Sequence, residues 1–152
     1  MDYQDNKPPY IDPREYKAQQ LHDFLTKIGA LESSSGTNLN HPVIQNGPDA
    51  GTHAVGQYGL MPRTAMDIDK ASGNQQLDDM DKFQAQDALM KDPELSDRLA
   101  QTMASKLLNK NDQETAAYKW LMGQYSNPTP EQIEKSPRVQ QFRVLNSKNA
   151  PK

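Results

Sequence analysis

The chain has 152 residues, of which 34% are hydrophobic and 24% are charged, and its formal net charge at pH 7 is -3. This length suits one domain with a single modest core. No basic stripe with interleaved aromatic residues occurs, so nucleic acid is not expected as a partner, and the absence of cysteine excludes disulfides and thiolate chemistry.

The two ends of the chain are predicted to be tails on either side of one domain. Residues 1–11 contain neither the basic segment nor the apolar segment of a secretory signal, so no signal peptide is expected. No stretch approaches the ~20 apolar residues needed to cross a bilayer. The expected organisation is a flexible N-terminal tail at 1–11, one domain at 12–146 and a C-terminal tail at 147–152.

Four helix starts are marked by a proline that directly follows a capping residue. Proline is tolerated at the first helical position because its missing N–H would have no partner within the helix. Two of the four also carry the reciprocal capping residue three positions further on. The four pairs are Asp12-Pro13, Asp92-Pro93, Thr129-Pro130 and Ser136-Pro137.

Helical spacing of apolar residues predicts six helices, each with one face toward the core. They are expected to run from Pro13 to about Ser33, from near Pro62, over Leu77–Met90, Pro93–Asn109 and Asp112–Met122, and from Pro137. The residues expected to face the core include Leu21, Phe24, Leu25, Ile28, Thr64, Ala65, Ile68, Leu95, Leu99, Thr102, Met103, Leu107, Val139, Phe142 and Leu145.

One region departs from helical periodicity. Residues 38–59 are rich in glycine and proline, and they are expected to form a long loop or a small β-hairpin. Loops of this length in compact domains are commonly functional or disordered. The predicted fold is therefore a small, mostly α-helical domain with one irregular lobe.

Glu32 is the first candidate for chemistry. It lies four residues after Ile28 and seven after Leu25, so it continues the apolar face of the first helix. A carboxyl group held against apolar side chains resists ionisation, which is the condition for a general acid that works near neutral pH. The alternative is that the helix has frayed by this point and that Glu32 is solvated.

Three short blocks occur in order along the chain: ESSSG, GQYGLMPRTAM and TAAYKWLMG. Together they resemble the blocks of the lysozyme-like lytic transglycosylases, and the resemblance covers about residues 20–123. The positions that match are Glu32 and Ser33 in the first block, Gly56, Leu60, Met61, Pro62, Thr64 and Ala65 in the second, and Ala116, Ala117 and Tyr118 in the third.

This resemblance implies a lysozyme-like (α+β) fold in a single domain, and cleavage of the β-1,4 bond between N-acetylmuramic acid and N-acetylglucosamine in peptidoglycan. Glu32 would protonate the glycosidic oxygen and then act as base on the muramic 6-hydroxyl, which closes onto C1 to give a 1,6-anhydro product. This route needs no second carboxylate. A lysozyme-type reaction would instead need an activated water, for which Asp49 is the candidate.

The resemblance also implies which residues contact the sugar, and the sequence departs from the family at some of them. Gln57, Tyr58 and Gly59 replace the family's Leu, Met and Gln, and Lys119 replaces its Asn. The segment between Glu32 and Gly56 spans 56 − 32 = 24 positions, which is longer than the family pattern. The implied substrate-binding residues are Ser33, Gln57, Tyr58, Gly59 and Tyr118, and Tyr118 would reach the Glu32 carboxyl.

Several neighbouring residues have two interpretations each. Trp120 and Tyr125 form a sugar-stacking wall in one, whereas in the other Trp120 belongs to the core, the commoner place for such a residue. Ser33 and Ser34 either contact the glycan or terminate the helix. We expect contact for Ser33, and both interpretations of Ser34 stay open.

A metal site is not expected. His41, Asp49 and His53 share one loop, but their spacing fits no standard zinc pattern. Neither a metal nor any other cofactor is required by the implied reaction.

The small size, the enlarged loop and the missing signal segment resemble phage virion-associated muramidases, which open the cell wall locally during genome entry. The implied partners are peptidoglycan glycan strands and other virion, tail or ejection proteins, and the implied location is the virion, with action in the bacterial periplasm or cell wall. Two other classes stay open: a catalytically inactive virion protein that keeps the lysozyme fold, suggested by Gly59 and Lys119, and a glycan-binding module.

Overall fold

The computed structural model describes residues 13–148, with side chains described for residues 14–145. Its helices are α1 (Pro13–Ser33), α2 (Pro62–Ser72), α3 (Lys82–Lys91), α4 (Pro93–Lys110), α5 (Gln113–Met122), α6 (Pro130–Lys135) and α7 (Pro137–Lys148). The predicted tail at 1–11 lies outside the described residues. So does most of the tail predicted at 147–152, of which residues 147 and 148 belong to α7.

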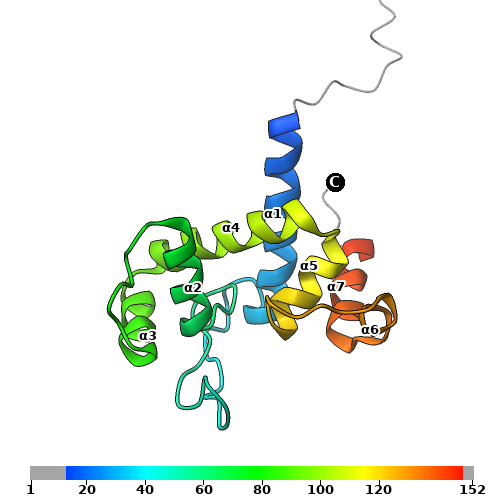
Figure 1. The fold of residues 1–152 in the computed structure, drawn as a ribbon. Coiled ribbons are helices and arrows are strands. Elements are labelled where there is room, and N and C mark those ends of the chain that lie inside the picture. The colour runs from blue at the N-terminus through cyan, green and yellow to red at the C-terminus, as the bar shows by residue number, and fades with distance from the viewer. Residues whose placement is uncertain (1–12, 149–152) are drawn as a thin grey trace, which may run out of the picture.

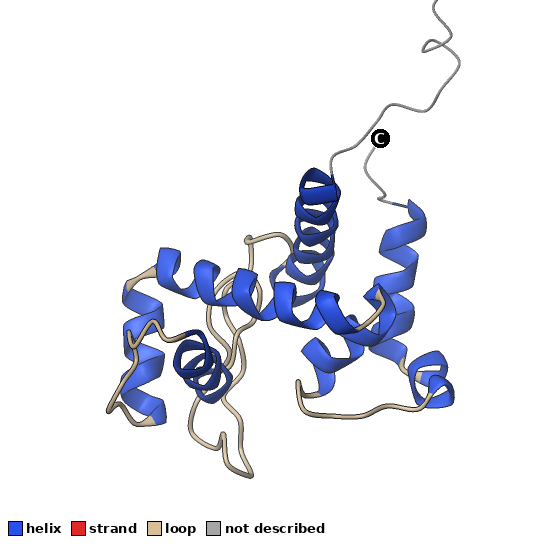
Figure 2. Ribbon diagram, turned by 45° about the horizontal axis from the view of Figure 1, so that its top comes forward, coloured by secondary structure: helices blue, strands red, loops and turns tan. Residues whose placement is uncertain are grey.

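The central helix of the fold is α4, which packs against α1, α2, α3 and α5. Figure 1 shows α4 crossing α1, with α2 and α3 at one end and α5, α6 and α7 at the other. We call these groups the α2–α3 lobe, which includes the loop 34–61, and the α5–α7 lobe. The same arrangement is seen from another side in Figure 2. The C-terminal end of α1 lies between the two lobes, so a side chain there can meet both.

The core joins α1 to the α5–α7 lobe through aromatic rings. Phe24 is fully buried, and its ring centroid lies 5.7 Å from that of Phe142 and 6.1 Å from that of Trp120. Such tilted and edge-on ring pairs stabilise a fold beyond the area that they bury. Of the residues predicted to face the core, four are only half-buried: Leu21, Thr64, Thr102 and Leu145.

Most predicted helix boundaries are confirmed by the caps. The Asp92 carboxylate accepts a hydrogen bond from the Leu95 amide at 3.2 Å, and the Asp112 carboxylate accepts one from the Thr115 amide at 2.8 Å. Thr129 forms the reciprocal capping box with Gln132, and a short helix, α6, follows it. Asp12, the cap predicted for α1, lies outside the described residues.

The predicted start of the third helix is wrong. The helix begins at Lys82 rather than at Leu77, because Asp81 forms a capping box with Gln84. The residues before it make a turn held by Asp69, which is 1% exposed. Its carboxylate accepts hydrogen bonds from the amides of Gln76 and Leu77 at 3.1 and 2.8 Å. Leu77 is buried by this turn and not by the helix. Its apolar side chain nevertheless fits the helical spacing, which is why the sequence predicts an earlier start.

Residues 38–59 form a long loop, one of the two alternatives that the sequence allowed. The loop folds back on itself where the Ile44 amide donates to the Thr52 carbonyl oxygen, and the Gly51 amide to that of Ile44, each at 2.8 Å. A single antiparallel bridge joins Val55 to Leu60, and no strand forms in the described residues. The fold is thus mostly helical, as predicted.

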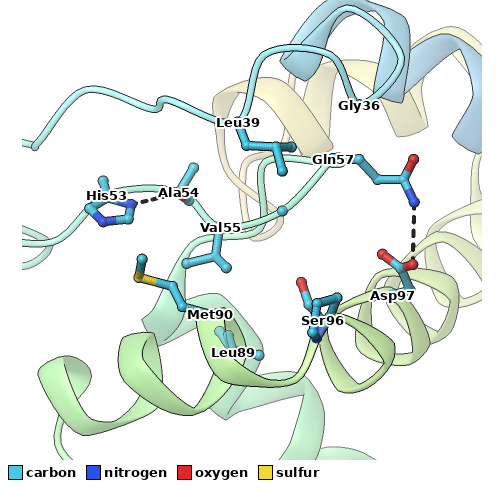
Figure 3. Close-up of a pocket in the computed structure, with 12 residues that line it drawn as sticks. Gly36, Leu39, His53, Ala54, Val55, Gln57, Leu89, Met90, Ser96 and Asp97 are labelled. Atoms are coloured by element: carbon cyan, nitrogen blue, oxygen red, sulfur yellow. Dashed lines mark hydrogen bonds between the residues drawn. The ribbon is translucent and has the colours of Figure 1, made fainter.

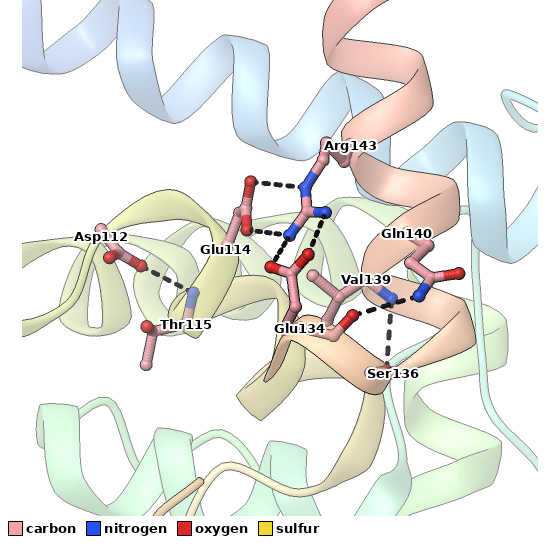
Figure 4. A network of polar contacts seen from close by, with 8 residues as sticks. All are labelled: Asp112, Glu114, Thr115, Glu134, Ser136, Val139, Gln140 and Arg143. Carbon is pink, nitrogen blue, oxygen red and sulfur yellow. Dashed lines mark hydrogen bonds and ion pairs between the residues drawn. The ribbon is translucent and has the colours of Figure 1, made fainter. Parts of the chain in front are cut away.

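The α5–α7 lobe is held together by a charged network at its surface (Figure 4). The Arg143 guanidinium on α7 donates to both carboxylate oxygens of Glu114 on α5, at 2.7 and 3.0 Å. It also donates to both carboxylate oxygens of Glu134 on α6, at 3.0 and 3.2 Å. One side chain therefore links the three helices of the lobe.

Within residues 13–148, no helix is both long enough and apolar enough to span a bilayer.

Candidate functional site

The end of α1 is tied to the turn at 56–60 by Ser33. Its side chain is 2% exposed, and its hydroxyl lies 2.6 Å from the Gln57 carbonyl oxygen and 3.1 Å from that of Gly29. The same oxygen accepts a hydrogen bond from the Gly36 amide at 2.9 Å. Because these backbone groups use the hydroxyl, Ser33 positions the site and does not present its side chain to a ligand. The sugar contact expected of Ser33 stays a prediction, and the burial of its hydroxyl does not favour it.

Glu32 lies directly against the Gly59 backbone. A Cβ placed on Gly59 would come within 3.0 Å of the Glu32 Cδ and 3.1 Å of its Cβ, and Gly59 has a φ of 63°, in the left-handed region. Both the space and the backbone conformation therefore favour glycine at this position. A glutamine, which the transglycosylase block that the sequence resembles has at this position, would meet the Glu32 side chain, so the close contact with Glu32 accounts for the glycine.

The Glu32 carboxylate is paired with Arg138 of α7. The Arg138 guanidinium donates to Glu32 Oε1, and the side chains are 42% and 16% exposed, respectively. The fraying alternative is excluded in this structure, because Glu32 is within α1 and mostly covered. The carboxylate was expected to be held against apolar side chains, and the structure places the Arg138 cation against it. No periodicity or block in the sequence indicated Arg138.

Tyr58 lies between the two helices that meet at the site. Its ring packs on α1, where a Cβ on Gly29 would lie 3.4 Å from the Tyr58 Cε1 atom. Its carbonyl oxygen accepts a hydrogen bond from the Trp120 indole N–H of α5 at 3.1 Å. Burial raises the pKa of Tyr58, and the nearby charge of Asp97 raises it further. Trp120 is therefore a core residue that holds the turn at 56–60 in place.

Gln57 faces the opposite side of this turn, toward α4. Its side-chain amide donates to Asp97 Oδ2 at 3.2 Å. Figure 3 shows both residues at the edge of a cavity of about 340 Å³, with Leu39 on the facing loop and Leu89 and Met90 on α3. We call it the Gln57 cavity. Its lining is mainly apolar with a few polar groups, which is the usual character of a small-ligand site.

A second depression lies beside Arg138, the partner of Glu32. It has a volume of about 710 Å³ and is lined by residues of α5, α6 and α7, including Tyr118, Gln132, Lys135 and Arg138. We call it the Arg138 hollow. Glu32 lines neither cavity, but it pairs with Arg138, which lines the hollow, and it lies against Gly59, two residues after Gln57.

Tyr118 shares the Arg138 hollow, but no hydrogen bond joins it to Glu32 within the described residues. The expected contact between this hydroxyl and the carboxyl is thus not observed, and Arg138 takes that place. Tyr125 is 75% exposed, whereas Trp120 is buried, so the two do not form one stacking wall. The pKa of Tyr125 is raised by desolvation and by the neighbouring Asp67.

The polar residues of the long loop contact different partners and do not form one cluster. His41 Nε2 lies 2.8 Å from the Gly56 carbonyl oxygen, and His53 Nδ1 lies 2.7 Å from that of Ala54. The Asp49 carboxylate lies 3.7 Å from the Arg63 guanidinium of α2. No group of three or more His, Asp or Glu side chains among the described residues is placed to hold a metal ion.

Comparison with protein-family models, with curated proteins and with solved structures finds no match to this chain. The candidate site is therefore defined by its own geometry. It consists of a mostly covered carboxylate at the end of a helix, a glycine turn and an arginine against it, and a hollow lined by that arginine.

Proposed function

We propose that the chain is a peptidoglycan lytic transglycosylase with a lysozyme-like fold, in which Glu32 carries both proton transfers. The observation that supports this most is the position of Glu32. Its side chain is 16% exposed at the end of α1, where it lies against Gly59 and pairs with Arg138, a residue that lines the Arg138 hollow. A glycan strand bound in the Arg138 hollow would contact Arg138, the residue that pairs with this carboxylate.

In the proposed reaction, protonated Glu32 donates its proton to the glycosidic oxygen as the bond from C1 of N-acetylmuramic acid to that oxygen breaks. The muramic 6-hydroxyl then forms a bond to C1, and its proton passes to Glu32. The products are a 1,6-anhydro-muramoyl end and a free hydroxyl on the leaving N-acetylglucosamine. The carboxyl group ends the cycle protonated, as it began, so no second carboxylate or cofactor is needed.

The single-carboxylate route is favoured over the lysozyme-type route by the place of Asp49. Asp49 belongs to the long loop, where its carboxylate faces Arg63 of α2, and no hydrogen bond or ion pair joins it to Glu32 within the described residues. Release of reducing ends instead of anhydro ends would favour the lysozyme-type route and a water held by Asp49.

A structural role for Glu32 is the competing explanation, and its ion pair with Arg138 is the observation that favours it. An inactive virion protein or a glycan-binding module would keep such a pair for stability alone. For the active enzyme we propose association with a virion and its tail or ejection proteins, and action on the cell wall during genome entry.

Clearance of purified sacculi separates these functions. Wild type should lower the turbidity, and Glu32→Gln should not, although it should still sediment with the sacculi. Glu15→Gln, an exposed change on the first turn of the same helix, is the matched control and should behave as wild type. If wild type sediments with the sacculi but does not clear them, the protein is a glycan-binding module. If wild type neither sediments with the sacculi nor clears them, it is a structural protein.

A further inference from the structure

Part of the Arg138 side chain pairs with Glu32, and another part is exposed to solvent. Arg138 is the second residue of α7, its side chain is 42% exposed, and it lines the Arg138 hollow. A guanidinium carries five N–H donors in a planar fork, and this geometry matches a carboxylate. The fork can therefore hold a carboxylate that enters from the hollow.

Two cations, Arg138 and Lys135, and one anion, Glu131, line the hollow, and Arg138 is the cation placed to receive an anionic ligand. Lys135 also lines the hollow, but its ammonium group is paired with Glu131 at 2.9 Å, and both side chains are about three-quarters exposed. The partner of Arg138 is Glu32, the residue that must take up a proton in the proposed reaction. A carboxylate that replaced Glu32 on the guanidinium would release Glu32 for that role.

We infer that Arg138 is a carboxylate-binding site for the muramic acid side of the glycan. The inference rests on the proposed function and deepens it. A substrate carboxylate, either on the lactyl ether of muramic acid or on the peptide attached to it, takes the place of Glu32 on the guanidinium. Glu32 is then free to take up from water the proton that it donates to the glycosidic oxygen, and the 6-hydroxyl returns a proton to it at the end of the reaction. A neutral glycan such as chitin lacks this group and leaves Glu32 paired.

The site can be tested by binding alone, with a disaccharide that lacks the scissile bond. The probe is N-acetylglucosaminyl-β-1,4-N-acetylmuramic acid with a free lactyl carboxylate. It is compared by calorimetry with the same disaccharide as its lactyl amide, and with one whose lactyl group carries an L-Ala-D-Glu dipeptide. These arms distinguish the two carboxylate sources, and chitobiose serves as the neutral reference.

Wild type should bind at least one of the two acidic probes about tenfold more tightly than the amide, as expected for a hydrogen-bonded ion pair. Arg138→Gln should remove this preference, and Arg138→Lys should keep part of it because the charge remains without the fork. Arg63→Gln changes an exposed arginine on α2, outside the hollow, and should keep the full preference.

Equal binding of the amide and both acids by wild type would overturn the inference, and this comparison needs no variant that could misfold. A preference that survives in Arg138→Gln would also overturn it. The two proposals can fail separately. A preference for the acidic probes without clearance of sacculi would support the carboxylate site and contradict the proposed reaction. Clearance of sacculi without any preference for the acidic probes would support the reaction and contradict the carboxylate site.

Discussion

The Ser33 hydroxyl donates a hydrogen bond of 2.6 Å to the carbonyl oxygen of Gln57, a residue 24 positions further along the chain. This bond fixes the last turn of α1 against the turn that carries Tyr58 and Gly59. It explains on physical grounds why a serine follows Glu32. The last backbone groups of a helix have no partners within the helix, and here the Ser33 hydroxyl supplies hydrogen bonds in their place. Its position also keeps the preceding carboxylate in place.

Replacing Ser33 with alanine should therefore destabilise the fold. The change leaves the Gly36 amide without its side-chain partner and removes the link to Gln57. The loss of such a buried hydrogen-bonding group costs about 1–3 kcal/mol in the free energy of unfolding. Urea unfolding of Ser33→Ala measures this, with the exposed Ser34→Ala as control. Equal stability of the two variants would contradict the linking role.

Gly59→Ala should disturb Glu32 as well as the backbone. A residue other than glycine in the left-handed region costs roughly 1–2 kcal/mol, and here the added Cβ also meets the Glu32 side chain. Gly73→Ala is the matched control, because Gly73 has a φ of 76° and nothing within 4 Å of its added Cβ. Gly59→Ala should lose more stability and also sacculus clearance, whereas Gly73→Ala should keep clearance. Similar losses in both would show that the contact with Glu32 does not matter.

Tyr58→Phe should change how stability depends on alkaline pH. Burial raises the pKa of the folded-state phenol above its ordinary value of 10.0, so the folded state holds this proton more tightly. This shift contributes to the free energy of unfolding. The contribution is fully present below the pKa of Tyr58 in the unfolded chain, and it is lost as pH rises through the pKa in the folded state, since the unfolded chain releases the proton first. Relative to wild type, Tyr58→Phe should gain stability as pH rises above about 10. Urea unfolding across this range measures the difference, and a difference that is constant with pH would contradict it.

Arg143→Gln should loosen the α5–α7 lobe. The side chain donates to Glu114 and to Glu134, and these bonds raise the pKa of its guanidinium (Figure 4). Thermal unfolding should show a lower Tm for this variant, with the loss reduced at high salt because the network is partly exposed. Lys135→Gln removes an isolated, exposed pair with Glu131 and should leave the Tm almost unchanged. An equal effect of the two changes would contradict the network's role.

Local signals in the sequence were enough to predict most of the helices. Proline after a capping residue marked the starts of α4, α6 and α7, and the apolar spacing of α4 placed Leu95, Leu99 and Met103 in the core. The start of α3 was missed because Leu77 is buried by a turn held by Asp69, a contact across eight residues that periodicity cannot reveal.

The candidate site was predicted in part. The contact between the end of α1 and the turn at 56–60 agrees with the interpretation that Glu32 and the GQYGLMPRTAM block belong to one site. Arg138 was missed because it lies 106 residues from Glu32 and belongs to no periodic or block pattern. The burial of Ser33 was also missed, because the sequence does not say which backbone carbonyl a serine hydroxyl will meet.

The central claim is that Glu32 transfers protons in glycan cleavage. Mass spectrometry of the fragments released from purified sacculi tests it most directly, with wild type and Glu32→Gln compared at equal concentration. Wild type should release fragments with 1,6-anhydro-muramoyl ends, and Glu32→Gln should release them at least about 100-fold more slowly. Release at the same rate by a folded Glu32→Gln variant, or no release by wild type, would contradict the claim.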